Sequence, residues 1–145
     1  MASKYAPFGF VFALMLTTGA AVAILSSEQA AKRPNLTLRA SPMMAFAPAR
    51  IVLTAELKDG PNDYEEFYCP SVEWDWGDGT KSESSADCDP YEAGKSEIKR
   101  RFAAQVVYAS PGAFKVQFRL KRKDKVLTAA TVTITVRGGM DSSPY

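Results

Sequence analysis

The chain has 145 residues, a length that suits one domain. Its 18 basic and 16 acidic residues nearly cancel, so no overall positive field points to a nucleic-acid partner. It contains no histidine, which excludes His-based catalytic triads and removes the most common protein ligand of transition metals.

The first 25 residues have the pattern of a targeting segment. Lys4 lies in a short polar start, and residues 8–25 form an uncharged, largely apolar run of 18 residues. Ala21-Val22-Ala23 is a small-x-small cleavage site, which favours a secretory signal peptide removed after Ala23. Two alternatives stay open. One is an uncleaved membrane anchor, because about 18 helical residues span nearly the ~30 Å hydrocarbon core; the other is a buried core helix.

The rest of the chain divides into a linker, a domain and a tail. Residues 26–33 are polar and are expected to be a linker, residues 34–137 the domain, and residues 138–145 a flexible tail. Strands are expected at residues 35–40, 49–58, 71–76, 81–87, 98–108, 113–121 and 130–136. Residues 43–47 lie between two prolines and are expected to be a crossing loop. About seven short strands, with no helical stretch after residue 34, predict an all-β, two-sheet antiparallel sandwich.

Apolar and polar residues alternate along these segments, which predicts the side chains that face the core. Strand 81–87 is polar on both faces, as expected of an exposed edge strand. The residues expected to point inward from two of the other strands are Ile51, Leu53, Ala55, Leu57, Phe114, Val116, Phe118 and Leu120.

Residues 71–80 combine an alternating strand with a turn. Val72, Trp74 and Trp76 fall on one face of the strand, and the carboxylates between them fall on the other. Both tryptophans are therefore expected in the core. Asp78-Gly79 is expected to form a two-residue type I′ turn, because Asp and Gly tolerate the positive φ that this turn requires.

The two cysteines are placed symmetrically about that turn. In a hairpin with a two-residue loop, Cys69 and Cys88 would lie opposite each other. A disulfide is therefore predicted if the chain is exported, since exported domains keep such bonds. A pair of free buried thiols is the alternative.

Two blocks of this sequence resemble the PKD (polycystic kidney disease) domain family. Residues 74–79 read W-D-W-G-D-G, and residues 108–116 read Y-A-S-P-G-A-F-K-V. The resemblance implies an extracytoplasmic immunoglobulin-like sandwich over residues 34–137 and no particular chemistry. It gives structural roles to Trp74, Asp75, Trp76, Gly77, Asp78, Gly79, Tyr108, Pro111 and Gly112. The chain departs from the family pattern in insertions at residues 65–69 and 82–94.

Residue types in these insertions leave few routes to catalysis or metal binding. Carboxylate pairs are abundant, so a small hydrolase is a remote alternative, but an interior filled by Trp and Phe leaves little room for a catalytic cleft. Two acidic loops could offer oxygen ligands to calcium, although neither has EF-hand spacing. The alternative is that these acids only solvate exposed loops. The weak candidates are Asp59, Asp63, Glu65 and Glu66 on one loop, and Asp87, Asp89 and Glu92 on the other.

Aromatic residues flank both cysteines within the insertions. Tyr64, Phe67, Tyr68 and Tyr91 are candidate binding residues, because aromatic rings beside carboxylates can contact a glycan or a protein. The alternative is that they cover the disulfide.

The sequence therefore predicts an exported, non-catalytic module that binds, adheres or acts as a spacer. The expected location is secreted, periplasmic or at the cell surface, with the membrane contacted only through an uncleaved N-terminal segment. The expected partner is a cell-surface or extracellular protein or a polysaccharide, and not nucleic acid. The alternative is a calcium- or glycan-binding accessory module that uses the acidic and aromatic loops. No cofactor other than calcium is considered.

Overall fold

The computed structural model of the protein describes residues 32–139. The predicted signal or anchor segment, residues 26–31 of the linker and residues 140–145 of the tail lie outside the described residues. Within residues 32–139, no helix has the length and apolar character needed to cross a membrane.

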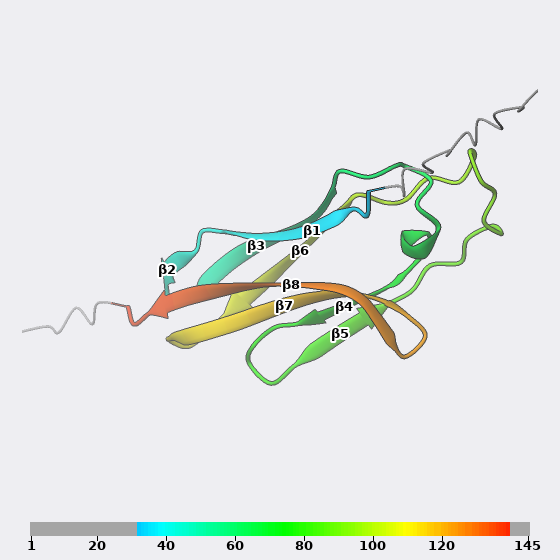
Figure 1. Cartoon of the computed structure of the whole chain (residues 1–145). Coiled ribbons are helices and arrows are strands. Elements are labelled where there is room, and N and C mark those ends of the chain that lie inside the picture. Colours follow the sequence, from blue (N-terminus) through cyan, green and yellow to red (C-terminus); the bar gives the residue numbers. More distant parts are fainter. Residues whose placement is uncertain (1–31, 140–145) are drawn as a thin grey trace, which may run out of the picture.

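The described residues form two packed β-sheets (Figure 1). The elements are β1 (Asn35–Ser41), β2 (Met44–Phe46), β3 (Ala49–Lys58), the 3₁₀ turn η1 (Glu65–Phe67), β4 (Ser71–Asp75), β5 (Lys81–Ser84), β6 (Arg101–Tyr108), β7 (Gly112–Arg122) and β8 (Lys125–Arg137). One sheet has the order β1-β3-β6 and the other β2-β8-β7-β4-β5. The predicted two-sheet sandwich is confirmed, with one strand more than expected in this range.

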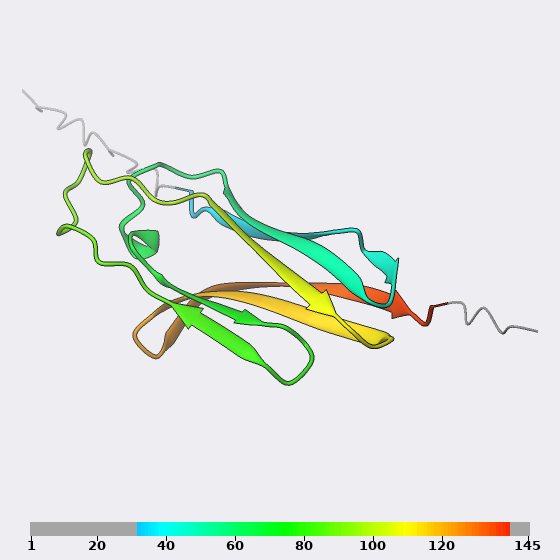
Figure 2. The ribbon, with the colours of Figure 1, turned by 180° about the vertical axis from the view of Figure 1, so that it is seen from behind.

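The strand order is that of an immunoglobulin-like domain. Strands β1, β3 and β6 match A, B and E of that fold, and β4, β7 and β8 match C, F and G. All neighbours are antiparallel except β2, which pairs in parallel with β8 at a sheet edge. The immunoglobulin constant-type sheet has a fourth strand, D, next to E. Here β6 is instead the last strand of its sheet, and the chain between β5 and β6 runs outward as a long loop (Figure 2).

Strand β2 corrects the expected crossing loop at residues 43–47. The prolines at either end do not prevent pairing, because the groups between them reach β8: Thr135 N–H donates to Met43 O (2.9 Å) and Ala47 N–H donates to Arg137 O (2.8 Å). A short edge strand needs few backbone bonds, and alternation of side chains is too brief over three residues to reveal it.

The core lies between the sheets and follows the predicted alternation. Ile51, Leu53, Ala55 and Leu57 are buried from β3, and Val116, Phe118 and Leu120 from β7, whereas Phe114 is only partly buried. Trp74 is 7% exposed and packs on Phe118 with ring centroids 4.5 Å apart. Trp76 stacks on Trp74 but is only partly buried, since it lies where the strand ends.

Residues of the second motif block contact residues of the first block. Tyr108, at the end of β6, donates from its hydroxyl to Trp76 O (2.7 Å), and burial raises the pKa of Tyr108 to about 12. Gly77 has a φ of 76°, and a Cβ there would lie 2.7 Å from Lys115 O on β7. The motif glycine is therefore required by its backbone angle and by the close approach of a core strand.

The turn after the tryptophans differs from the predicted two-residue type I′ turn. Strand β4 pairs with β5 so that Asp75 lies opposite Lys81, which leaves a five-residue loop centred on Asp78. Gly77 and Gly79 both have positive φ, and the Asp78 carboxylate accepts bonds from Thr80 N (2.9 Å) and Oγ1 (2.6 Å). These bonds hold the pKa of Asp78 below its usual range. The predicted two-residue turn was therefore wrong: the loop is longer, and the two strands pair one residue out of the predicted register, with Asp75 opposite Lys81 and not opposite Ser82.

The structure contains the predicted disulfide between Cys69 and Cys88, with a Cα–Cα distance of 6.2 Å. The reason differs from the prediction. Both cysteines lie outside the β4–β5 ladder, which ends at the pair Val72–Ser84. The bond therefore joins two loops rather than opposite residues of a hairpin.

Candidate binding site at the loop end

Two long loops gather at one end of the sandwich. One runs from the end of β3 to β4 and contains η1; the other runs from β5 to β6 (Figure 2). The Cys69–Cys88 disulfide joins them. These loops contain both insertions and all the aromatic and acidic candidates predicted from the sequence.

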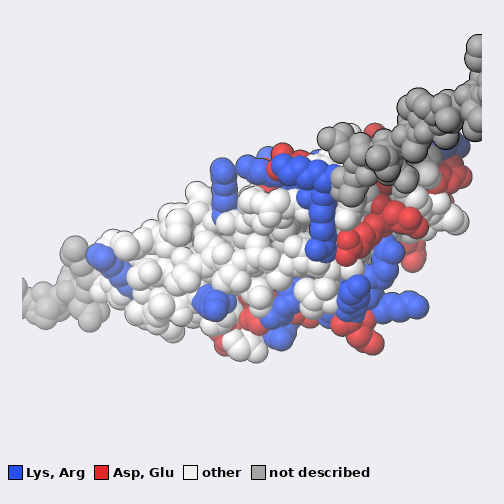
Figure 3. Space-filling view, viewed as in Figure 1, with Lys and Arg blue, Asp and Glu red and all other residues white. Residues whose placement is uncertain are grey.

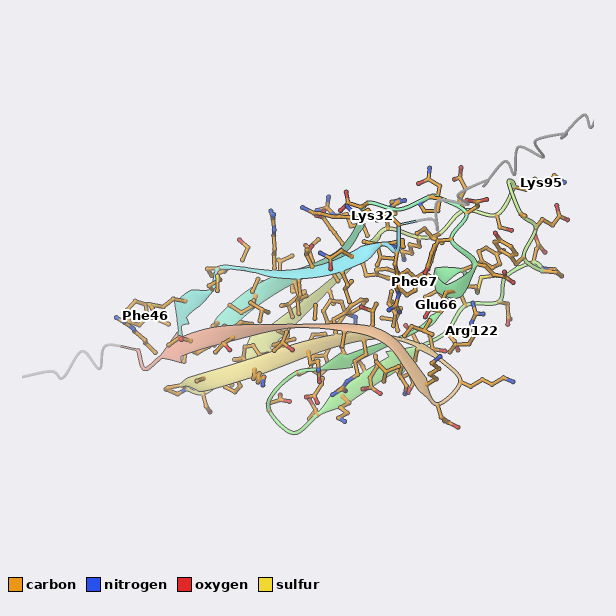
Figure 4. The ribbon with its side chains drawn as sticks, viewed as in Figure 1. Lys32, Phe46, Glu66, Phe67, Lys95 and Arg122 are labelled. Atoms are coloured by element: carbon orange, nitrogen blue, oxygen red, sulfur yellow. A yellow bond between two sulfur atoms is a disulfide. The ribbon has the colours of Figure 1, made fainter. Side chains whose placement is uncertain are left out.

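Phe67 is not a binding residue, which corrects the prediction. Its side chain is completely buried under the sandwich end, with the Tyr64 ring 5.2 Å away and the Arg33 guanidinium 5.1 Å from its ring centre (Figure 4). Tyr64 is partly buried, and its hydroxyl donates to Glu66 (3.3 Å). The side chain of Phe67 has no surface left for a partner.

Tyr68 and Tyr91 connect the two loops. Their rings meet edge to face at 5.5 Å. Tyr68 Oη donates to Asp89 O (2.9 Å), and Tyr91 Oη donates to Asp63 O (2.5 Å), each on the opposite loop. Desolvation, followed by the nearby acidic charges, raises the pKa of the Tyr91 hydroxyl. Both hydroxyls are thus used within the protein, and the rings hold the loops together.

The acidic candidates are spread along the loops. Four have partners inside the protein: Asp59 pairs with Lys32 (3.2 Å), Glu66 with Arg33 (3.0 Å) and Glu92 with Lys95 (2.9 Å), and Asp63 accepts from Gly94 N (3.1 Å). The others are the exposed Glu65, Asp87 and Asp89. Across residues 32–139, no three Asp, Glu, Cys or His side chains come close enough to hold a metal ion.

Arginine side chains fasten the loops to the sandwich, a role that the sequence analysis missed. Arg100 donates to the carbonyls of Asp59 and Gly60 (both 2.8 Å) and to Asn62 Oδ1 (2.9 Å). Arg122, near the β7–β8 turn, donates to three carbonyls around η1 at 2.9–3.2 Å (Figure 4). These bonds satisfy backbone groups that the irregular loops leave without ladder partners. A basic residue beside a turn is the only sequence signal for them.

The basic residues Arg119 and Lys121 belong to an ion-pair ladder across β4, β5 and β7. Lys121 Nζ lies 3.0 Å from Glu73 and 3.4 Å from Glu83, and Arg119 also contacts Glu73. Their side chains are only 21% and 16% exposed, respectively. Hydrogen bonds from Lys121 and then Arg119 lower the pKa of Glu73. This surface is therefore neutralised internally and offers no free basic patch.

A cleft of about 310 Å³ lies between the start of β6 and the segment that follows β5. Val72, Trp74 and Phe102 form an apolar floor. The disulfide and Tyr68 form one wall, and polar groups surround the mouth. The full lining is Tyr68, Cys69, Pro70, Val72, Trp74, Ser84, Ser85, Ala86, Cys88, Glu97, Lys99, Phe102 and Ala103.

The mouth of the cleft carries one acid and one base. Lys99 Nζ lies 5.2 Å from the Phe102 ring centre, and neither Lys99 nor Glu97 has an ion-pair partner among residues 32–139. An apolar floor with a few polar groups at the rim is the usual composition of a ligand site. A second hollow of about 440 Å³ nearby is shallower and lined mainly by polar loop residues.

Charge is distributed unevenly along the molecule. In Figure 3, charged side chains concentrate over the half that carries the loops, whereas the end formed by β2 is largely uncharged. Met43, Met44 and Phe46 are more than half exposed near β2. The loop end is thus the polar end of the domain and also the end that contains the cleft.

No family model matches this chain, and no curated protein matches it. Among solved structures, it is similar to the PKD domain of an M14-like peptidase from a Thermoplasmatales archaeon, with a TM-score of 0.49, 14% identity, and coverage of 74% of this chain and 98% of that one. It is also similar to a CARDB domain from Pyrococcus furiosus. The crystal structure of that domain with di-metal ions gives a TM-score of 0.42 and 12% identity, and its solution NMR structure gives 0.46 and 10%. Each covers 72% of this chain and 94% of the other.

Proposed function

We propose that this protein is a non-catalytic binding module that works outside the cytoplasm and contacts a protein or a polysaccharide of the cell surface. The observation that carries the proposal is the cleft beside the disulfide, with Trp74 and Phe102 at its floor. Aromatic and aliphatic surfaces with a polar rim suit a peptide side chain or the apolar face of a sugar ring.

The rigidity of the loop end supports recognition through this cleft. The disulfide, the Tyr68–Asp89 and Tyr91–Asp63 bonds and the arginine bonds to loop carbonyls all restrict the same two loops. A site that is already ordered loses less conformational entropy when a ligand binds. Disulfides persist mainly in oxidising compartments, which supports work outside the cytoplasm.

The path of the chain supports a spacer role in addition. The described chain begins toward the loop half of the sandwich, and it leaves at the opposite end, after β8 (Figures 1 and 2). The two ends of the described chain, at residues 32 and 139, are therefore separated along much of the domain's length. A module of this shape can act as a spacer between what is attached at its two ends.

The experiment compares the unchanged protein with a cleft variant and a matched control. Ser84 lines the cleft, and Ser84→Phe would fill it; Thr131→Phe adds the same ring to an exposed position on β8. The three proteins are applied to a glycan array and to an array of extracellular proteins. We expect a set of ligands that bind the unchanged protein and Thr131→Phe but not Ser84→Phe. Equal binding by all three proteins would place recognition away from the cleft and refute the proposal.

A further inference from the structure

Strand β6 is the least protected sheet edge in the described part of the chain. Of the other edge strands, β2 has three residues, β5 has four and carries Lys81 and Glu83, and β1 packs against β8 of the opposite sheet. Strand β6 has eight residues and pairs only with β3. Between Phe102 and Val107 it has no charge, no proline and no shift of register. Charges, prolines and bulges are the usual features that keep an edge from pairing with another strand.

The register identifies which backbone groups of β6 point away from the sheet. Leu57 N–H donates to Arg100 O (2.8 Å), so this is a hydrogen-bonded pair of the β3–β6 ladder. Such pairs recur at every second residue of an antiparallel ladder. The N–H and C=O groups of Phe102, Ala104 and Val106 therefore point toward β3. Those of Ala103, Gln105 and Val107 point outward, toward the position that strand D occupies in a four-stranded sheet.

The cleft lies beside this edge. Phe102 and Ala103 both belong to β6 and line the cleft, and Trp74 lines it from the facing sheet. Successive side chains of a strand point to opposite faces. A strand added next to β6 would thus direct alternate side chains inward, over Trp74 and Phe102, and one apolar side chain would fit the apolar floor.

Basic residues at the start of β6 favour a ligand that carries a carboxylate. The Arg101 side chain is 71% exposed, and its one ion-pair partner among residues 32–139, Glu56, is at 4.0 Å. Lys99 is exposed at the cleft mouth. Glu97 at the rim and Glu56 beside Arg101 balance the two basic residues in formal charge, but Lys99 has no ion-pair partner among residues 32–139. A carboxylate at this end of an added strand would be attracted, because opposite charges on adjacent strands stabilise the pair.

We propose that β6 accepts an extended segment of a partner protein as the fourth strand of its sheet, with an apolar side chain in the cleft and a carboxylate beside Lys99 and Arg101. This inference rests on the proposed function and narrows its ligand to a polypeptide. A polypeptide has N–H and C=O groups at the spacing of the outward groups of Ala103, Gln105 and Val107. A polysaccharide lacks that repeat.

The probe is a phage-displayed library of random nine-residue peptides, selected on the full chain recovered from an oxidising compartment. Enriched peptides should be β-forming, with an apolar residue and a carboxylate near one end, and the best is then synthesised. Ala103→Pro removes an outward N–H that β3 does not use, and edge positions of this kind tolerate proline. We expect it to weaken peptide binding at least tenfold, while the control Thr131→Val, at an exposed position of β8 outside the cleft, binds as the unchanged protein does. Lys99→Glu should weaken only peptides that carry the carboxylate.

Amide hydrogen exchange tests the same inference without a substitution. In the free protein, the amides of Ala103, Gln105 and Val107 should exchange fast and those of Ala104 and Val106 slowly; the synthetic peptide should slow the first group. Peptides that bind Ala103→Pro normally, or that leave these amides unprotected, would overturn the proposal. So would a dimer in light scattering that Ala103→Pro dissociates, since a second copy would then occupy the edge. Glycan binding lost in Ser84→Phe, with no enriched peptide, would keep the proposed function and refute this inference alone.

Discussion

Replacing Gly77 by alanine should destabilise the domain far more than the same change two residues later. At Gly77 an added Cβ would lie 2.7, 2.8 and 2.9 Å from the O, N and C atoms of Lys115, and its φ is 76°. Because these are backbone atoms of a core strand, they cannot move aside as a flexible side chain can. Gly79 has a φ of 89°, and no atom lies within 4 Å of its added Cβ. The two positions therefore share the backbone penalty, and only Gly77 has the clash.

The magnitudes follow from these two terms. A left-handed conformation costs a residue with a Cβ about 1–2 kcal/mol, and forcing extra volume into a packed site costs about 1–3 kcal/mol. Gly79→Ala should thus lose about 1–2 kcal/mol and Gly77→Ala about 2–5 kcal/mol in free energy of unfolding. At roughly 4 °C per kcal/mol for a small domain, the melting temperature should fall by about 4–8 °C and 8–20 °C, respectively.

Urea unfolding followed by tryptophan fluorescence measures both free energies, because Trp74 and Trp76, the two tryptophans of the chain, lie at the start of this loop. The m-value should stay the same in both variants, which would show that only stability has changed. Equal losses for Gly77→Ala and Gly79→Ala would refute the argument. The left-handed backbone conformation alone, and not the close contact with β7, would then explain why glycine is needed at position 77.

Four further results are expected. Alkylation and mass spectrometry of protein recovered from an oxidising compartment should find no free thiol at Cys69 or Cys88, and replacing both by serine should cost about 3 kcal/mol for a loop of about 20 residues; two alkylated cysteines would contradict the bond. Trp74→Ala should cost about 3–5 kcal/mol, because its ring is buried against another aromatic ring; solvent-like emission from both indoles would contradict this. Glu73 has a lowered pKa and Lys121 a raised one, so their pairing should stabilise the domain at neutral pH, with the Glu73 contribution lost as pH falls below about 4.5 and the Lys121 contribution lost above about 10.5. Glu73→Gln should flatten the acid side of the stability curve; an unchanged acid limb would argue against the pair. Millimolar calcium should leave the melting temperature unchanged; a melting temperature that rises with calcium and then saturates would indicate a metal site.

Predictions based on alternation succeeded where a strand is long and has one buried face. Ile51, Leu53, Ala55 and Leu57 face the core because a period of two places them on one side of the backbone, whatever lies around it. The turn after Asp75 was predicted with two residues and is a five-residue loop, because two glycines and one aspartate allow more than one loop in nearly the same sequence. The local propensities of these residues do not select one loop conformation. The pairing of β4 with β5 and β7 selects it.

For the aromatic residues of the insertions, too, the tertiary structure decided what the local sequence pattern could not predict. Phe67 was expected at a binding surface because it lies beside carboxylates in the insertion before Cys69, yet η1 turns it into the core. Tyr68 and Tyr91 contact each other across 23 positions of sequence, which no periodic pattern reveals. Their hydroxyls bond to carbonyls of the opposite loop, so their main role in the structure is to join the loops.

The sequence by itself determined the sandwich class, the inward faces of the long strands and the polar edge strand β5, because each depends on residue type and local backbone geometry. It also indicated the disulfide, but the tertiary structure places that bond between two loops and not across a hairpin. Only the tertiary structure decided where the cleft lies and which edge is open. The cleft exists because Trp74 and Phe102 come from different sheets and the loop after β5 runs outward instead of covering them. Strand β6 is open because no described segment pairs with its outer side. Both features depend on how distant segments pack, which the pattern along one strand does not contain.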